Sequence, residues 1–221
     1  MKTKTYFLVI ILSLMMNSAF AQKNGQANSY YEKITEAISS LNSADDYQSY
    51  LEAGQQFQNI AEEEKSKWVP FYHAGYAYIQ AALKLPAAKK TLILLDSAQR
   101  MVDKTIEFGG LGNSKIICLR GYLYYAQQFR TPNNNTNIIA RKATQELDRA
   151  RFLDDSNPRP YYVIGLVLDQ LDPRIGGNKK SACKHFQNAD ERFKNFTPRS
   201  ELSPNWGAQD NAAHLLKCNQ K

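Results

Sequence analysis

Three histidines and three cysteines are the side chains best suited to bind a metal ion or to act as nucleophiles. Cys183 lies two residues before His185, and His214 lies four residues before Cys218. Two histidines and two cysteines form a known ligand set for zinc. Residues i and i+2 of a helix do not share a face, so Cys183 and His185 would point in different directions. We therefore expect no metal site and no cofactor.

Motifs of common enzymes are absent from the sequence. It contains no HExxH, GxSxG, CxxC, P-loop or GxGxxG pattern. Acidic pairs such as Asp45-Asp46 and Asp154-Asp155 fall at expected helix ends, where carboxylates cap helices more often than they catalyse. The protein is expected not to be an enzyme.

The N-terminal residues predict export. Lys2 and Lys4 precede an apolar run, and Ala19-Phe20-Ala21 has the small-x-small pattern of a signal-peptide cleavage site. We expect a signal peptide over residues 1–21, a short disordered stretch over 22–28, and a location in the periplasm or outside the cell. The apolar run is too short to cross a bilayer and no later segment is apolar enough, so the protein is expected not to span a membrane.

The charge pattern argues against a nucleic-acid partner. The sequence has 28 basic and 21 acidic residues, a formal net charge of +7. The basic residues are scattered, and no expected helix carries a basic stripe with interleaved aromatic residues. A mildly basic solvated surface is the ordinary interpretation.

The spacing of Cys183 and Cys218 favours a disulfide. Cys183 falls on an expected helix over residues 179–195, and Cys218 on one over 207–219. The midpoint between them lies in the connecting loop, so in an antiparallel hairpin the two residues stand at the same height. An exported protein is able to form disulfides. We expect this bridge, with two buried thiols as the alternative, and we expect Cys118 to be a small buried or groove residue.

A pattern of small and large residues recurs along the chain. A helix face with Ala143, Leu147 and Ala150 is followed by the turn LDDSNP and a second helix containing Gly165. The alanine recurs at positions 53, 98, 143 and 182, and the glycine at 75, 121 and 165. This pattern resembles the tetratricopeptide repeat, a helix pair of about 34 residues. The chain also resembles exported bacterial tetratricopeptide-like proteins that carry similar segments, which are WVPFY and PNWG in this sequence.

The resemblance implies an all-α fold, a right-handed α-α superhelix of about four helix pairs and a C-terminal capping helix. One helix pair cannot bury its apolar face alone, and stacking provides a continuous core. The single domain would cover 29–221, with repeats over 29–65, 66–110, 114–155 and 158–196 and a cap over 205–221. The glycine-to-alanine spacing is longer than in a regular repeat, so we expect extended connections inside the repeats. The nine expected helices are 28–41, 45–63, 68–84, 87–107, 114–129, 138–153, 159–170, 179–195 and 207–219.

The resemblance also implies a binding groove along the first helices of the repeats. In tetratricopeptide proteins, the groove is lined by residues at fixed distances from the glycine of the first helix. These residues lie three positions before that glycine and one, four and five positions after it. The binding residues expected on this basis are Tyr72, Tyr76, Tyr122, Tyr125, Tyr162, Leu166 and Asp169. Tyrosine combines an apolar ring with a polar tip, which suits recognition. The alternative is that these rings pack between helices or lie under the long connections.

The expected function is a non-enzymatic scaffold of the bacterial cell envelope that binds a protein or peptide in this groove. The alternative is a periplasmic helical-repeat protein that binds a small molecule or lipid and assists a transporter. An open trough would favour a peptide, and a closed apolar tunnel would favour a small ligand. Both hypotheses rest on analogy of fold.

Overall fold

The computed structural model describes residues 29–86, 89–130 and 136–220, which form nine α-helices and one 3₁₀ turn. The predicted signal peptide and residues 22–28 lie outside this part of the chain. The first helix covers residues 29–43. The others are α2 (Tyr47–Glu63), α3 (Trp68–Leu83), α4 (Lys89–Gly109), α5 (Ser114–Arg130), α6 (Thr136–Leu153), α7 (Arg159–Gln170), α8 (Lys179–Asn195) and α9 (Ala208–Asn219), with η1 (Pro173–Ile175) between α7 and α8. The expected helices agree with these bounds to within about two residues at each end.

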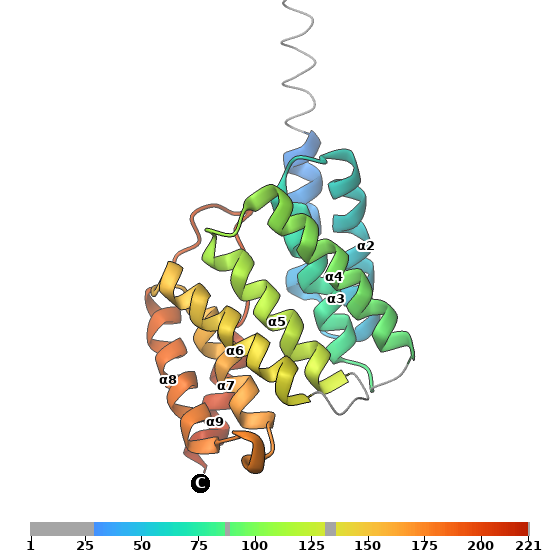
Figure 1. The fold of residues 1–221 in the computed structure, drawn as a ribbon. Helices are drawn as coiled ribbons and strands as arrows, with labels where there is room; N and C mark the ends of the chain where they lie inside the picture. The colour runs from blue at the N-terminus through green and yellow to red at the C-terminus, as the bar shows by residue number, and fades with distance from the viewer. Residues whose placement is uncertain (1–28, 87–88, 131–135, 221) are drawn as a thin grey trace, which may run out of the picture.

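Helices that follow each other in the chain pack against each other, from α2 and α3 through to α8 and α9. The helices α3, α5 and α7 also contact one another in a row. Figure 1 shows the N-terminal helices at one end of the molecule and α8 and α9 at the other. This all-α arrangement of sequential helix pairs confirms the coarse prediction, and the right-handed superhelix stays a prediction.

The recurring glycines mark places where two helices come close together. A Cβ atom built on Gly121 would lie 2.7 Å from Leu147, and one on Gly165 would lie 2.5 Å from Phe186. Contacts below about 3 Å are not found for real Cβ atoms, so these two positions accept only glycine without rearrangement. The large residue of one helix therefore packs directly on the backbone of its partner.

Between Gly75 and Ala98 much of the extra length lies in helices, whereas α7 and α8 are joined by the expected long connection over residues 171–178. Helix α4 has 21 residues and α6 has 18. Helix α3 ends at Leu83 and α4 already begins at Lys89. Longer helices bury more apolar surface along each pair, because each added turn places another residue on the packed face.

The acidic pair Asp45-Asp46 has the capping role expected of it. The Asp46 carboxylate accepts a hydrogen bond from the Ser49 backbone N–H at 2.7 Å, and the Ser49 hydroxyl accepts one from the Asp46 N–H at 3.2 Å. This reciprocal arrangement begins α2. In the described part of the chain, no helix combines the length and apolar character needed to cross a bilayer.

Candidate ligand-binding site

The tyrosines of the expected groove gather on one face of α3, α5 and α7, which we call the tyrosine face. Its five members are Tyr72, Tyr76, Tyr122, Tyr125 and Tyr162, and all five are buried. The rings of Tyr76 and Tyr122 stack with centroids 6.3 Å apart, and those of Tyr122 and Tyr125 are 5.8 Å apart. Burial raises the pKa of Tyr76, Tyr122 and Tyr162 well above the ordinary value, so these hydroxyls are neutral.

The tyrosine face is covered by the chain itself. Residues 196–207 connect α8 to α9, and we call them the C-terminal segment (Figure 1). Its Trp206 ring stacks on Tyr76 at 4.9 Å and on Tyr122 at 5.2 Å. The Trp206 indole N–H donates a hydrogen bond to the Tyr72 hydroxyl at 3.0 Å. An indole thus occupies the space that the expected groove would offer to a ligand.

Two buried basic side chains hold the backbone of the C-terminal segment. Arg159 Nη2 donates to the Pro204 carbonyl at 2.7 Å, and His73 Nε2 lies 3.0 Å from the Leu202 carbonyl. The Arg159 guanidinium also lies over the Phe196 ring, 4.5 Å from its centroid. Binding through the tyrosine face would require this segment to move, so the role of these tyrosines in binding stays a prediction.

The remaining residues singled out from the sequence lie in different surroundings. Leu166 is buried, whereas Asp169 is partly exposed and pairs with Lys179 Nζ at 2.8 Å. Cys118 is buried, and burial raises the pKa of its thiol to about 12. A thiol with that pKa is not a nucleophile at neutral pH.

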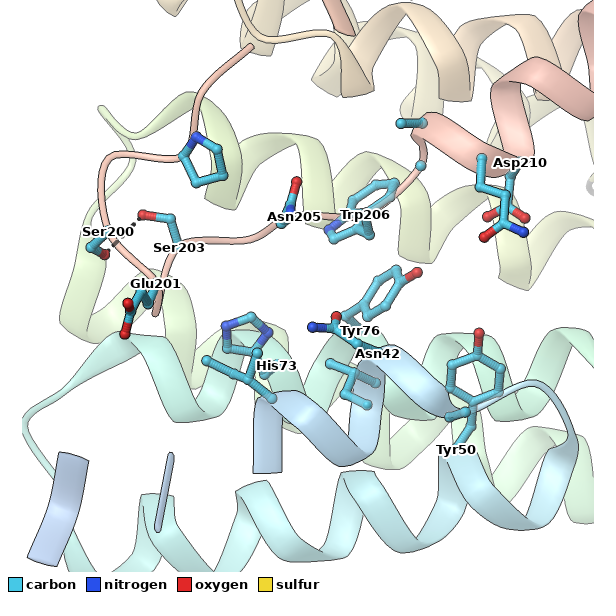
Figure 2. Close-up of a pocket in the computed structure, with 17 residues that line it drawn as sticks. Asn42, Tyr50, His73, Tyr76, Ser200, Glu201, Ser203, Asn205, Trp206 and Asp210 are labelled. Atoms are coloured by element: carbon cyan, nitrogen blue, oxygen red, sulfur yellow. Dashed lines mark hydrogen bonds between the residues drawn. The ribbon is translucent and has the colours of Figure 1, made fainter. Parts of the chain in front are cut away.

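A hollow of about 390 Å³ remains beside the C-terminal segment. It is lined by the rings of Tyr50, Tyr76 and Trp206 and by the carboxylates of Glu201 and Asp210. Figure 2 shows Asp210 on one side of the hollow, across from Tyr50 and Tyr76. Among the described residues that line it there is no lysine or arginine, so the hollow is acidic and disfavours anionic ligands.

A second pocket, of about 850 Å³, lies between α8 and α9, and we call it the basic pocket. Phe186, His214 and the Cys183–Cys218 disulfide line its inner part. Four lysines surround it together with one acidic residue, Asp169. The lysines are Lys179, Lys180, Lys184 and Lys217. The pocket therefore combines an apolar and aromatic floor with a net positive rim.

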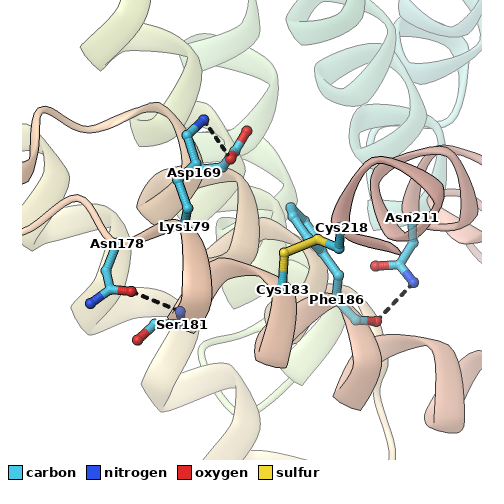
Figure 3. The surroundings of a disulfide bond; sticks show 8 residues. All are labelled: Asp169, Asn178, Lys179, Ser181, Cys183, Phe186, Asn211 and Cys218. Carbon is cyan, nitrogen blue, oxygen red and sulfur yellow. Dashed lines mark hydrogen bonds and ion pairs between the residues drawn. A yellow bond between two sulfur atoms is a disulfide. The ribbon is translucent and has the colours of Figure 1, made fainter. Parts of the chain in front are cut away.

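The floor of the basic pocket is fixed by several contacts (Figure 3). The predicted disulfide is present, with 5.8 Å between the Cα atoms of Cys183 and Cys218. The Asn211 side-chain amide donates to the Phe186 carbonyl at 3.0 Å. The His214 ring stacks on Phe186 with centroids 4.7 Å apart. These contacts join α9 to α8 and set the width of the pocket.

His214 presents a neutral imidazole to the basic pocket. Burial lowers its pKa, and the nearby charge of Lys217 acts in the same direction. The ring is then uncharged at neutral pH, and it is able to contact an apolar ligand surface without a desolvation penalty for a charge. No group of three or more His, Cys, Asp or Glu side chains within the described ranges is placed to hold a metal ion.

Sequence reasoning did not find the basic pocket. Lys180 and Lys184 are four residues apart on α8, so they share a helix face, and this spacing was readable from the sequence. Lys217 and His214 belong to α9, and their approach to α8 depends on the path of the C-terminal segment. The sequence segment PNWG contains Trp206, but nothing in the sequence indicated that this residue packs on the tyrosine face.

Comparison with solved structures shows a similar fold in a known protein. The chain matches the HusA haemophore from Porphyromonas gingivalis with a TM-score of 0.75 and 25% sequence identity. The match covers 86% of this chain and 93% of the haemophore chain. No protein-family model matches the sequence, and no curated protein matches it at a significant level. The chain is thus similar over 86% of its length to a haemophore.

Proposed function

We propose that the protein is an exported, non-enzymatic carrier that binds haem or a closely related tetrapyrrole. The observation that carries this proposal is the similarity to a haemophore over 86% of the chain. Helical-repeat folds serve many functions, so the fold alone would not select this one. The Cys183–Cys218 disulfide agrees with an oxidising location outside the cytoplasm.

The basic pocket supports the proposal through its chemistry. Haem is a flat apolar ring system with two carboxylate side chains. A pocket of about 850 Å³ falls in the range of roughly 300–1,000 Å³ that is usual for small-molecule sites. The partly exposed His214 ring, which stacks on the buried Phe186, provides apolar contact for a macrocycle. The lysines provide charge-assisted hydrogen bonds for its carboxylates.

The lysines on α8 are not explained by helix stability. Lys179 and Lys180 stand in the first turn of α8, where the helix dipole is positive. Cations are favoured at the opposite end of a helix, so two lysines here repel the dipole and each other. Lys179 is balanced by Asp169, whereas Lys180 and Lys184 have no ion pair with any described residue. A pocket for an anionic ligand accounts for this concentration of charge.

This proposal adopts the small-molecule alternative rather than the peptide-binding scaffold. A peptide would need an open trough along α3, α5 and α7, and the C-terminal segment covers that face. The acidic hollow beside the segment is the wrong charge for haem carboxylates. Assistance to a transporter stays a prediction.

The proposal is tested by titrating haemin into the purified mature protein and following its Soret absorbance. We expect saturable binding that is weakened at least about tenfold in Lys180→Glu/Lys184→Glu, because charge-assisted hydrogen bonds contribute about 1.5–3 kcal/mol each. The control is Lys89→Glu/Lys142→Glu, which changes the net charge equally at exposed lysines outside the pocket.

Two outcomes would count against the proposal. If the folded wild-type protein binds no haemin, the proposed function is wrong. Equal losses in the two charge-reversed variants would mean that overall charge, rather than the basic pocket, attracts the ligand.

A further inference from the structure

A second group of cations lies around a separate pocket of about 480 Å³, where α5 and the end of α8 meet the C-terminal segment. We call it the segment pocket. The side chains that matter are Lys115, Arg192, Arg199, Ser156, Asn195 and Thr197. Glu191 is the acidic residue among the described residues lining it. None of these residues belongs to the basic pocket.

Only one of the three cations is neutralised by a partner. Arg192 donates to the Asp155 carboxylate at 2.8 Å and to the Asp155 carbonyl at 2.7 Å. Lys115 and Arg199 form no ion pair within the described part of the chain. Two positive charges without an ion pair therefore face the segment pocket, which Glu191 also lines.

A third uncompensated cation lies directly behind the pocket. The Arg159 guanidinium is fully buried, 4.5 Å from the centroid of Phe196, whose ring lines the pocket. Its Nη2 donates to the Pro204 carbonyl, whereas Nε and Nη1 have no hydrogen-bond partner among the described residues. Burying an unpaired charge is costly, so the positive potential of Arg159 adds to that of the pocket.

The charges of Arg199 and Arg159 act on Lys115. The pKa of Lys115 is lowered, first by burial and then by the charges of Arg199 and Arg159. Asp154 opposes this effect as the weakest contribution. Repulsion from these two cations destabilises the charged form of Lys115, and a bound anion would relieve it.

We infer that the segment pocket binds a small oxyanion, a phosphate or carboxylate group, between Lys115 and Arg199. The ammonium and guanidinium supply charge-assisted hydrogen bonds, and the Thr197 hydroxyl supplies a neutral donor at the same pocket. Because Arg199 belongs to the C-terminal segment and Lys115 to α5, a bound anion also ties the segment to the helix row. This inference does not depend on haem binding.

The test titrates inorganic phosphate and acetate separately into the mature protein, at constant ionic strength maintained with chloride. The backbone amide resonances of Lys115, Phe196, Thr197 and Arg199 are followed by NMR. We expect a saturable shift, weakened at least about tenfold in Lys115→Gln/Arg199→Gln because two charged ligands are lost. Lys89→Gln/Lys142→Gln, with the same change in net charge, should bind as the wild type does. The anion that saturates at the lower concentration identifies the ligand class.

A second readout follows Lys115 itself. A bound anion favours the ammonium form, so the pKa of Lys115 should rise when the preferred anion is present. The inference is overturned if neither anion gives a saturable shift. It is also overturned if the Lys115→Gln/Arg199→Gln variant, shown to be folded, binds as well as the wild type does.

Discussion

At the scale of single residues, burial decides the charge state of His73. The ring stacks on Phe57 with centroids 4.9 Å apart and is almost completely buried. Burial lowers its pKa to about 4, and the charge of Arg159 acts in the same direction. Nδ1 has no hydrogen-bond partner in the described part of the chain. The neutral ring donates from Nε2 to the Leu202 carbonyl, so protonation at Nδ1 would place a charge in the core.

The free energy of unfolding should therefore depend on pH through His73. The folded-state pKa lies below the unfolded value of about 6.5, so between pH 6.5 and pH 4 the unfolded chain binds a proton that the folded chain excludes. The contribution of the neutral His73 to the free energy of unfolding is fully present above pH 6.5. It decreases by about 3 kcal/mol as the pH falls from 6.5 to 4.

Denaturant unfolding at several pH values, for wild type and His73→Gln, measures this effect. Glutamine keeps an amide donor for the Leu202 carbonyl but does not titrate. His185 and His214 are present in both proteins, so their contributions cancel in the comparison. Equal pH slopes in the two proteins would show that His73 is not the group responsible.

At the scale of helices, Gly165 controls how closely α7 and α8 approach. Phe186 is fully buried between His214 and Tyr162, with ring centroids 4.7 Å and 6.2 Å away, and has little room to turn aside. Gly165→Ala should destabilise the protein by about 1–3 kcal/mol through overpacking. This cost exceeds the roughly 0.5–1 kcal/mol that alanine gains over glycine in a helix.

Gly112→Ala is the matched control for the helix-packing prediction. A Cβ atom at Gly112 would meet no atom within 4 Å. Its effect on the free energy of unfolding should stay within about 0.5 kcal/mol. Thermal or denaturant unfolding measures both variants. A Gly165→Ala protein as stable as the Gly112→Ala protein would contradict the close packing of α7 on Phe186.

The sequence predicts the helices well because helical periodicity is a local signal. Ala143, Leu147 and Ala150 mark a packed face without knowledge of any partner. Residues 196–207 carry no such period, and Trp206 meets Tyr72 from 134 positions away. The Cys183–Cys218 bridge was predictable because both residues belong to consecutive helices. The basic pocket was not, since it depends on the gap that α9 leaves beside α8.

At the scale of the whole molecule, the disulfide and the C-terminal segment hold the last helix in place. The bridge closes a loop across a sequence separation of 35. In the chain-entropy description, losing such a cross-link costs about 4 kcal/mol. Reductant should lower the stability of the wild type to about that of Cys183→Ala/Cys218→Ala and leave the variant unchanged. Denaturant midpoints that do not respond to reductant in the wild type would contradict this.

The C-terminal segment also changes how the molecule is connected as a whole. A row of helix pairs in which each contacts only its neighbours can fray from either end, one pair at a time. Here Glu201 accepts a hydrogen bond from Tyr31, and Leu202 and Trp206 contact His73 and Tyr72 on α3. The C-terminal segment thereby joins α8 and α9 to the first described helix and to α3, so the row of helices is also connected between its two ends. Fraying at one end then releases the other, so the protein gains cooperativity that its repeats alone would not provide.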